Sequence, residues 1–141
     1  MTEKPSPEDP DVAFVLEAFQ AFEVQEGTLE EYYERFWVPD GVIEFVDGFP
    51  IRGSYQGLDG YKQWFADSYG PYDDVQRRLD SITKAGDRVV ALLTVTGRPK
   101  DADIGLEVQL GNTYELEDGR IKHLRVYVGH DRAVEAARNG G

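Results

Sequence analysis

The stretch GLEVQLGNTYELEDGRIKHLRVYV, residues 105–128, alternates apolar and polar side chains with a period of two, which is typical of β-strands. In its first half a single polar residue, Asn112, shares one face with five apolar ones: Leu106, Val108, Leu110, Tyr114 and Leu116. The pair Asp118-Gly119 predicts a tight turn into a second strand over residues 120–128. The stretch therefore predicts an antiparallel hairpin with one face turned to a core or a cavity.

Further strands are predicted before this hairpin, over residues 73–83 and 88–98, with a short one over 42–46. The N-terminal half has the helical period instead, with apolar residues that recur every three or four positions. Helices followed by hairpin-connected strands predict an α+β fold in which the helices pack on one face of a strongly curved mixed or antiparallel sheet.

Three helices are predicted in that half. The first has Asp11 as its cap, and the third contains Trp64. The second opens with Thr28 and Glu31, whose spacing is that of a capping box, in which each residue's side chain bonds the backbone N–H of the other. A short amphipathic helix around residues 133–137 closes the chain.

Length and composition predict a single domain. The 141 residues include 40% hydrophobic side chains, enough for a core. Residues 1–10, rich in proline and charge, are predicted to be a disordered N-terminal segment, residues 11–137 the domain, and residues 138–141 a frayed C-terminus.

The charge balance bears on partners and location. The formal net charge of −12 disfavours nucleic acid and anionic membranes as partners, because like charges repel. The absence of cysteine excludes thiol catalysis and thiolate metal sites. We find neither an apolar run of about 18 residues nor a signal peptide, and so expect a cytoplasmic protein.

Five local motifs occur in a characteristic order along residues 11–137. They are Glu26-Gly27, Phe36-Trp37-x-Pro39-Asp40-Gly41, Tyr55-x-Gly57-x-x-Gly60, Ala85-Gly86-Asp87-Arg88, and Tyr114 to Tyr127 with its Asp118-Gly119 turn. Through this ordered set of motifs the chain resembles the NTF2-like superfamily, on the branch that includes SnoaL-like polyketide cyclases and ketosteroid isomerases. The resemblance implies a cone whose helices close over the concave sheet face around a hydrophobic pocket. It also implies a homodimer joined by the outer sheet face.

The resemblance further implies candidate catalytic residues. Asp47 follows the first strand where the isomerases place their proton-shuttling carboxylate, although Asp47-Gly48 is more typical of a solvated hairpin turn. Asn112 stands where the family has a second acid. An amide donates a hydrogen bond but does not shuttle protons, so Asn112 either orients a substrate carbonyl or is a buried side chain satisfied by neighbouring backbone. Tyr32 or Tyr55 would supply a phenol donor.

The same resemblance and the strand alternation predict the pocket wall. Gln20 replaces the phenol that the isomerases carry on their first helix, and alternation turns Leu124, Val126 and Val128 toward the cone and His123 away from it. The predicted ligand-binding residues are Phe19, Gln20, Trp64, Phe65, Val108, Leu110, Leu124, Val126 and Val128.

Two functions are consistent with these residues. The first is a cofactor-free and metal-free isomerase or cyclase that binds a small, apolar, carbonyl-bearing molecule and transfers a proton next to the carbonyl. The second is a non-catalytic ligand-binding or dimeric interaction module of the same fold. A carboxylate with a perturbed pKa in the cone would favour the enzyme, whereas an apolar cavity suffices for the binding module.

Overall fold

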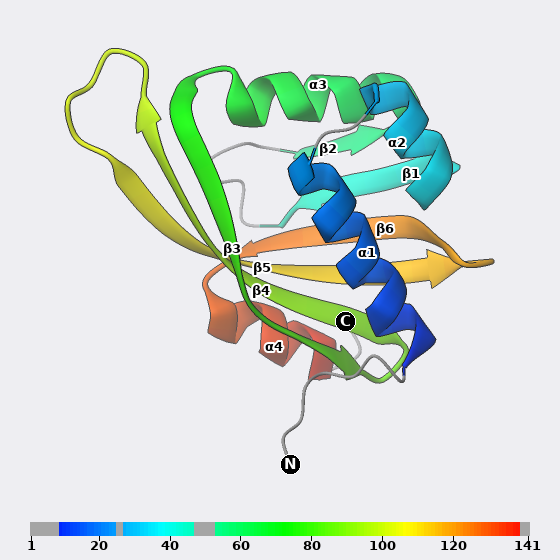
Figure 1. Ribbon diagram of the computed structural model, residues 1–141. Helices are drawn as coiled ribbons and strands as arrows, with labels where there is room; N and C mark the ends of the chain where they lie inside the picture. The colour runs from blue at the N-terminus through cyan, green and yellow to red at the C-terminus, as the bar shows by residue number, and fades with distance from the viewer. Residues whose placement is uncertain (1–8, 25–26, 47–52, 139–141) are drawn as a thin grey trace.

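The computed structural model describes residues 9–24, 27–46 and 53–138. These residues form ten elements, shown in Figure 1: α1 (Pro10–Val24), α2 (Leu29–Phe36), β1 (Trp37–Phe45), β2 (Gly53–Gln56), α3 (Gly57–Tyr69), β3 (Tyr72–Ala85), β4 (Arg88–Pro99), β5 (Leu106–Glu117), β6 (Arg120–Val128) and α4 (His130–Arg138). The predicted α+β class is confirmed. Among the described residues, no helix is long and apolar enough to cross a membrane.

The strands form one mixed sheet in the order β2-β1-β6-β5-β4-β3. The β1–β6 pair is parallel and all other neighbours are antiparallel. Register shifts interrupt β1, β3 and the β5–β6 pair, and such irregularities increase local bend and twist. The sheet therefore curls without closing, and its concave face can hold side chains and a cavity.

Alternation along the strands divides the sheet into an inner and an outer face. Val89 and Ala91 of β4 belong to the main core, which α1, α2 and α3 complete on the concave face. Val90, between them, belongs instead to a smaller cluster with Ala133 and Ala137 of α4. The helices thus lie on opposite sides of the curled sheet, three inside and α4 outside (Figure 1).

The helix starts follow local rules, with one correction. The Thr28–Glu31 capping box is present: the Glu31 N–H donates to Thr28 Oγ1 over 3.1 Å and the Thr28 N–H to Glu31 Oε1 over 2.9 Å. The prediction that Asp11 caps α1 is wrong. Asp9 caps it, accepting from the Asp11 N–H at 2.9 Å and the Val12 N–H at 3.2 Å, which leaves Pro10 at the first helical position, where its missing N–H costs nothing.

The region around β1 and β2 differs most from the predicted elements. β1 begins at Trp37, directly after α2, because Trp37 pairs with Ile121 of β6 rather than continuing the helix. The Pro39-Asp40-Gly41 part of the second motif lies within the register shift of this strand, between Trp37 and Val42. β2 arises from a glycine-rich stretch without a strand pattern, and its pairing of Ser54 with Glu44 of β1 shows that the neighbouring strand specifies it.

Candidate functional site

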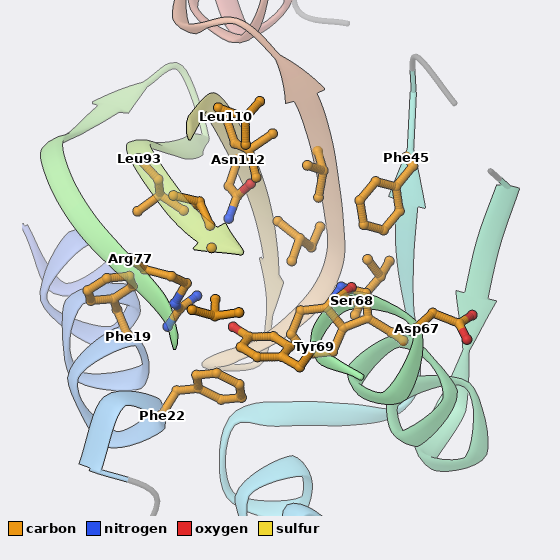
Figure 2. A pocket seen from close by; sticks show the side chains of 18 of the residues that line it. Phe19, Phe22, Phe45, Asp67, Ser68, Tyr69, Arg77, Leu93, Leu110 and Asn112 are labelled. Carbon is orange, nitrogen blue, oxygen red and sulfur yellow. The ribbon is translucent and has the colours of Figure 1, made fainter. Parts of the chain in front are cut away.

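A cavity of about 450 Å³ lies between the concave face of the sheet and the three inner helices (Figure 2). This volume is in the range of small-molecule sites, roughly 300–1,000 Å³. Its walls are mainly apolar and aromatic, and both tryptophans of the chain, Trp37 and Trp64, line it. Leu106, at the start of β5, is half exposed at the edge of the cavity.

Six of the nine predicted ligand-binding residues line this cavity: Phe19, Trp64, Val108, Leu110, Leu124 and Val126. The other three are not among the described lining residues. Gln20 is exposed on α1, one position beyond the inward-facing Phe19. Phe65 stacks on Tyr69 with ring centroids 4.8 Å apart and borders a smaller neighbouring cavity. Val128 is the last residue of β6, paired with the lining residue Leu110.

The polar centre of the cavity is on β5. Asn112 is only 6% exposed and lies in the middle of the sheet, between Ala91 of β4 and Val126 of β6. Its Nδ2 donates a hydrogen bond to the Tyr114 hydroxyl over 3.2 Å. Burial raises the pKa of Tyr114 and outweighs the opposing effect of this hydrogen bond, so the phenol stays protonated near neutral pH. The sequence left open that neighbouring backbone groups satisfy Asn112. For its amide nitrogen this does not hold, because the partner is the Tyr114 side chain.

Three of the lining residues hold a buried polar atom that has no hydrogen-bond partner within the described residues. These atoms are Asn112 Oδ1, Ser68 Oγ and Arg77 Nη2. In Figure 2 the Asn112 amide points into the cavity from one side, and the Arg77 side chain extends toward Tyr69 from another side. A buried donor or acceptor without a partner costs about 1–3 kcal/mol, so the cavity has hydrogen-bonding capacity that a ligand or water can satisfy.

Arg77 lines the cavity although the sequence patterns above do not single it out. Its side chain is 14% exposed, lies over the rings of Phe19 and Phe22 at 4.4 and 4.7 Å, and forms an ion pair with Glu23 of α1. A signal for it was present, because Arg77 alternates with Val75 and Leu79 on the inward face of β3, where a charge is unusual.

The two predicted phenol donors have their hydroxyls bonded within the protein. Tyr32 lines the cavity, but its hydroxyl donates to the Ala18 carbonyl over 2.7 Å. Tyr55 is not among the described lining residues, and its hydroxyl donates to Asp67 Oδ2 over 2.7 Å. The structure thus places Tyr114, rather than Tyr32 or Tyr55, beside Asn112.

Carboxylates are scarce within the described cavity wall. Asp47, the predicted base, lies outside the described residues. Asp67 lines the cavity, but its carboxylate points away from it toward β2 (Figure 2) and accepts from Tyr55 and Gln63. Glu107 is exposed at the start of β5.

The two histidines lie outside the cavity wall. His123 contacts Glu44 of β1 at 3.0 Å on the outer sheet face, where strand alternation predicts it. His130 Nε2 is 2.9 Å from the Leu93 carbonyl oxygen. Across the described residues, no group of three or more His, Cys, Asp or Glu side chains is arranged to hold a metal ion.

A family model described as the SnoaL-like domain matches residues 12–124, most of the chain. The chain belongs to the SnoaL-like domain family. The match ends before α4, the helix that packs on the outer face of the sheet. Curated protein sequences give no match to this SnoaL-like chain.

Solved structures share the SnoaL-like fold at low sequence identity. A protein from Jannaschia sp. CCS1, provisionally named a SnoaL-like polyketide cyclase, is 18% identical, with 99% of each chain covered and a TM-score of 0.70. An NTF2-like protein from Burkholderia thailandensis is 18% identical, with 89% of this chain and 95% of that chain covered and a TM-score of 0.73. A protein from Bacillus subtilis, provisionally named an isomerase, is 19% identical, with coverages of 93% and 96% and a TM-score of 0.66. At these identities the likeness establishes the fold.

Proposed function

We propose that this SnoaL-like protein binds a small, largely apolar molecule through a carbonyl oxygen, which accepts a hydrogen bond from Tyr114. The observation that carries the proposal is the Asn112–Tyr114 hydrogen bond inside the cavity. Because the Tyr114 oxygen accepts from Asn112, its own proton remains to be donated, and no acceptor for it occurs among the described residues. A ligand carbonyl meets this donor, while the apolar walls bury the rest of the molecule.

We further propose proton transfer at the carbon next to the carbonyl as the chemistry, in a cofactor-free isomerisation or aldol-type cyclisation. The names of the structural neighbours, a polyketide cyclase and an isomerase, support this chemistry. Tyr114 would stabilise the oxyanion of the enolate that forms when the proton leaves, and Asp47 would be the base. One observation supports the alternative, a non-catalytic binding module. Neither carboxylate of the described wall is placed to act as a base in the cavity, because Asp67 points away from it and is bonded to Tyr55, and Glu107 is exposed.

The binding proposal is tested with 2-acetylnaphthalene and with naphthalene, which lacks the carbonyl. Binding is followed by NMR on the indole N–H signals of Trp37 and Trp64, the two tryptophans of the cavity wall. We expect both signals to shift, and the ketone to bind about tenfold more tightly, as one buried hydrogen bond allows. Tyr114→Phe should remove this preference, whereas Tyr127→Phe, on the outer face under α4, should keep it. Equal binding of ketone and hydrocarbon to the wild type would overturn the proposal.

The chemistry is tested separately by incubating 2-acetylnaphthalene with the protein in D₂O. Catalysed exchange of the methyl protons beside the carbonyl, lost in Asp47→Asn while binding is kept, is the result expected for proton transfer. Binding without catalysed exchange in the wild type would instead favour the non-catalytic module.

A further inference from the structure

Arg77 is a cation held in an otherwise apolar part of the cavity wall. It extends from β3 beneath α1, with its guanidinium group over the rings of Phe19 and Phe22. Contact with aromatic faces stabilises the cation but leaves its N–H groups, which point outward in the guanidinium plane, to find acceptors elsewhere. The N–H groups of Arg77 therefore need hydrogen-bond acceptors other than the two rings.

Glu23 satisfies only part of this donor capacity. Arg77 Nε donates to Glu23 Oε2 over 2.7 Å. Nη2 lies 2.6 Å from the same oxygen as part of the ion pair, and it is buried with no hydrogen-bond partner among the described residues. The Glu23 side chain is 40% exposed, so water weakens the pair from its outer side. A guanidinium group carries five N–H donors, and the Glu23 carboxylate therefore leaves room for a second acceptor.

The surroundings of Arg77 favour an anion as that acceptor. Within the described wall, Asp67 and Glu107 are the only other charged residues, and neither contacts Arg77. Tyr69 and Tyr114 line the same cavity, with Arg77 extending toward Tyr69 (Figure 2), and burial raises the pKa of both phenols, so both stay protonated. The inner wall thus offers one cation and neutral hydroxyl donors.

We infer that the ligand of this cavity is an organic acid, whose carboxylate binds the inner edge of the Arg77 guanidinium. The inference rests on the proposed function, because the carboxylate would be the second polar group of the carbonyl-bearing molecule held by Tyr114. Arg77 is then a specificity-determining residue, and Glu23 is the internal carboxylate that competes with the ligand for it. The formal net charge of −12 does not prevent this, since salt screens charges beyond about 8 Å at physiological ionic strength, whereas a direct contact persists.

The test compares 2-naphthoate with 2-naphthamide, a neutral compound of nearly the same shape, at pH 7 and physiological salt. Affinities are measured by calorimetry and by the NMR signals of Trp37 and Trp64. We expect the wild type to bind the carboxylate about tenfold more tightly than the amide, because charge-assisted hydrogen bonds are about twice as strong as neutral ones. Arg77→Met should remove this preference and keep binding of the amide.

Glu23→Gln gives a second reading that does not depend on Arg77→Met folding. Removing the competing carboxylate should strengthen binding of 2-naphthoate several-fold and leave 2-naphthamide unchanged. The matched control is Glu17→Gln on the same helix, which changes the net charge equally but affects an exposed ion pair with Arg35 outside the cavity wall. It should change neither affinity.

The outcomes separate this inference from the proposed function. If 2-naphthamide and 2-acetylnaphthalene bind but 2-naphthoate binds no more tightly, or if Glu23→Gln and Glu17→Gln act alike, the inference is wrong and the Arg77–Glu23 pair serves to hold α1 on β3. If neither ketone, amide nor carboxylate binds, the proposed function itself fails.

Discussion

Asn112 Nδ2 donates to the hydroxyl of Tyr114, two residues along the same strand, and this leaves Asn112 Oδ1 buried without a hydrogen-bond partner among the described residues. Residues two apart on a strand point to the same face, so the pair acts as one polar unit in the cavity wall. Such an unpaired acceptor destabilises the empty protein and favours a bound donor. Stability and ligand binding therefore oppose each other at this position.

Asn112→Leu tests this opposition. Replacing the amide by an apolar side chain of similar size removes the unpaired acceptor but also the hydrogen bond to the Tyr114 hydroxyl. These two effects oppose each other, so we expect the free energy of unfolding to stay within about 1 kcal/mol of the wild type. The affinity for 2-acetylnaphthalene should fall about tenfold, because the Tyr114 hydroxyl is no longer oriented by Asn112. Urea denaturation and NMR titration measure the two quantities. A large loss of stability would show that the amide is a structural part of the core.

Tyr55→Phe should affect stability rather than ligand binding. Burial, followed by the hydrogen bond to Asp67, raises the pKa of Tyr55 to about 12. The variant should lose about 1 kcal/mol of stability, the typical net contribution of one such bond, with the ketone affinity unchanged. Its tyrosinate absorbance should match that of the wild type up to about pH 11 and fall below it at higher pH. A weakened ketone affinity would place Tyr55 in the binding site after all.

Gly111→Ala should loosen α4. A β-carbon at Gly111 would overlap the Ala133 side chain, which is fully buried against this strand. We expect a loss of about 1–3 kcal/mol, typical of overpacking. The double variant Gly111→Ala with Ala133→Gly should recover part of it, although glycine in a helix costs about 1 kcal/mol. If the two substitutions are strictly additive in urea denaturation, the contact is not the cause.

Glu115→Gln should reduce stability at neutral pH and lose its effect in acid. Burial alone would raise the pKa of Glu115, but Arg125, at 3.1 Å, and Arg88, at 2.7 Å, together lower it below its usual value. A lowered carboxyl pKa stabilises the fold above the unfolded pKa of about 4.3, and this contribution disappears as the pH falls through the folded-state value.

We therefore expect Glu115→Gln to cost about 1–2 kcal/mol at pH 7 and to approach the wild type near pH 3, measured by urea denaturation at both pH values. Glu17→Gln, in an exposed pair, should be almost neutral throughout. A difference between Glu115→Gln and the wild type that does not change with pH would contradict the assigned ion pairs.

The side chains of the long strands that face inward follow from the sequence alone. The period-two alternation of residues 105–116 places Val108, Leu110 and Asn112 on one face, and the structure puts all three in the cavity wall. The capping box at Thr28 was equally predictable. Both follow from geometry that repeats over two or three residues, and this geometry is local.

The contacts between polar groups, in contrast, depend on how distant segments pack. Arg77 and Glu23 form a hydrogen bond although they are 54 positions apart in the sequence. Tyr55 donates to Asp67 because β2 and α3 pack together. The same holds for β2, whose sequence has no strand pattern and which pairs with β1. Periodicity gives the direction of a side chain, whereas its partner depends on how distant segments pack around the curled sheet. For this reason most of the cavity wall could be predicted from the sequence, whereas the partners of its polar groups could not.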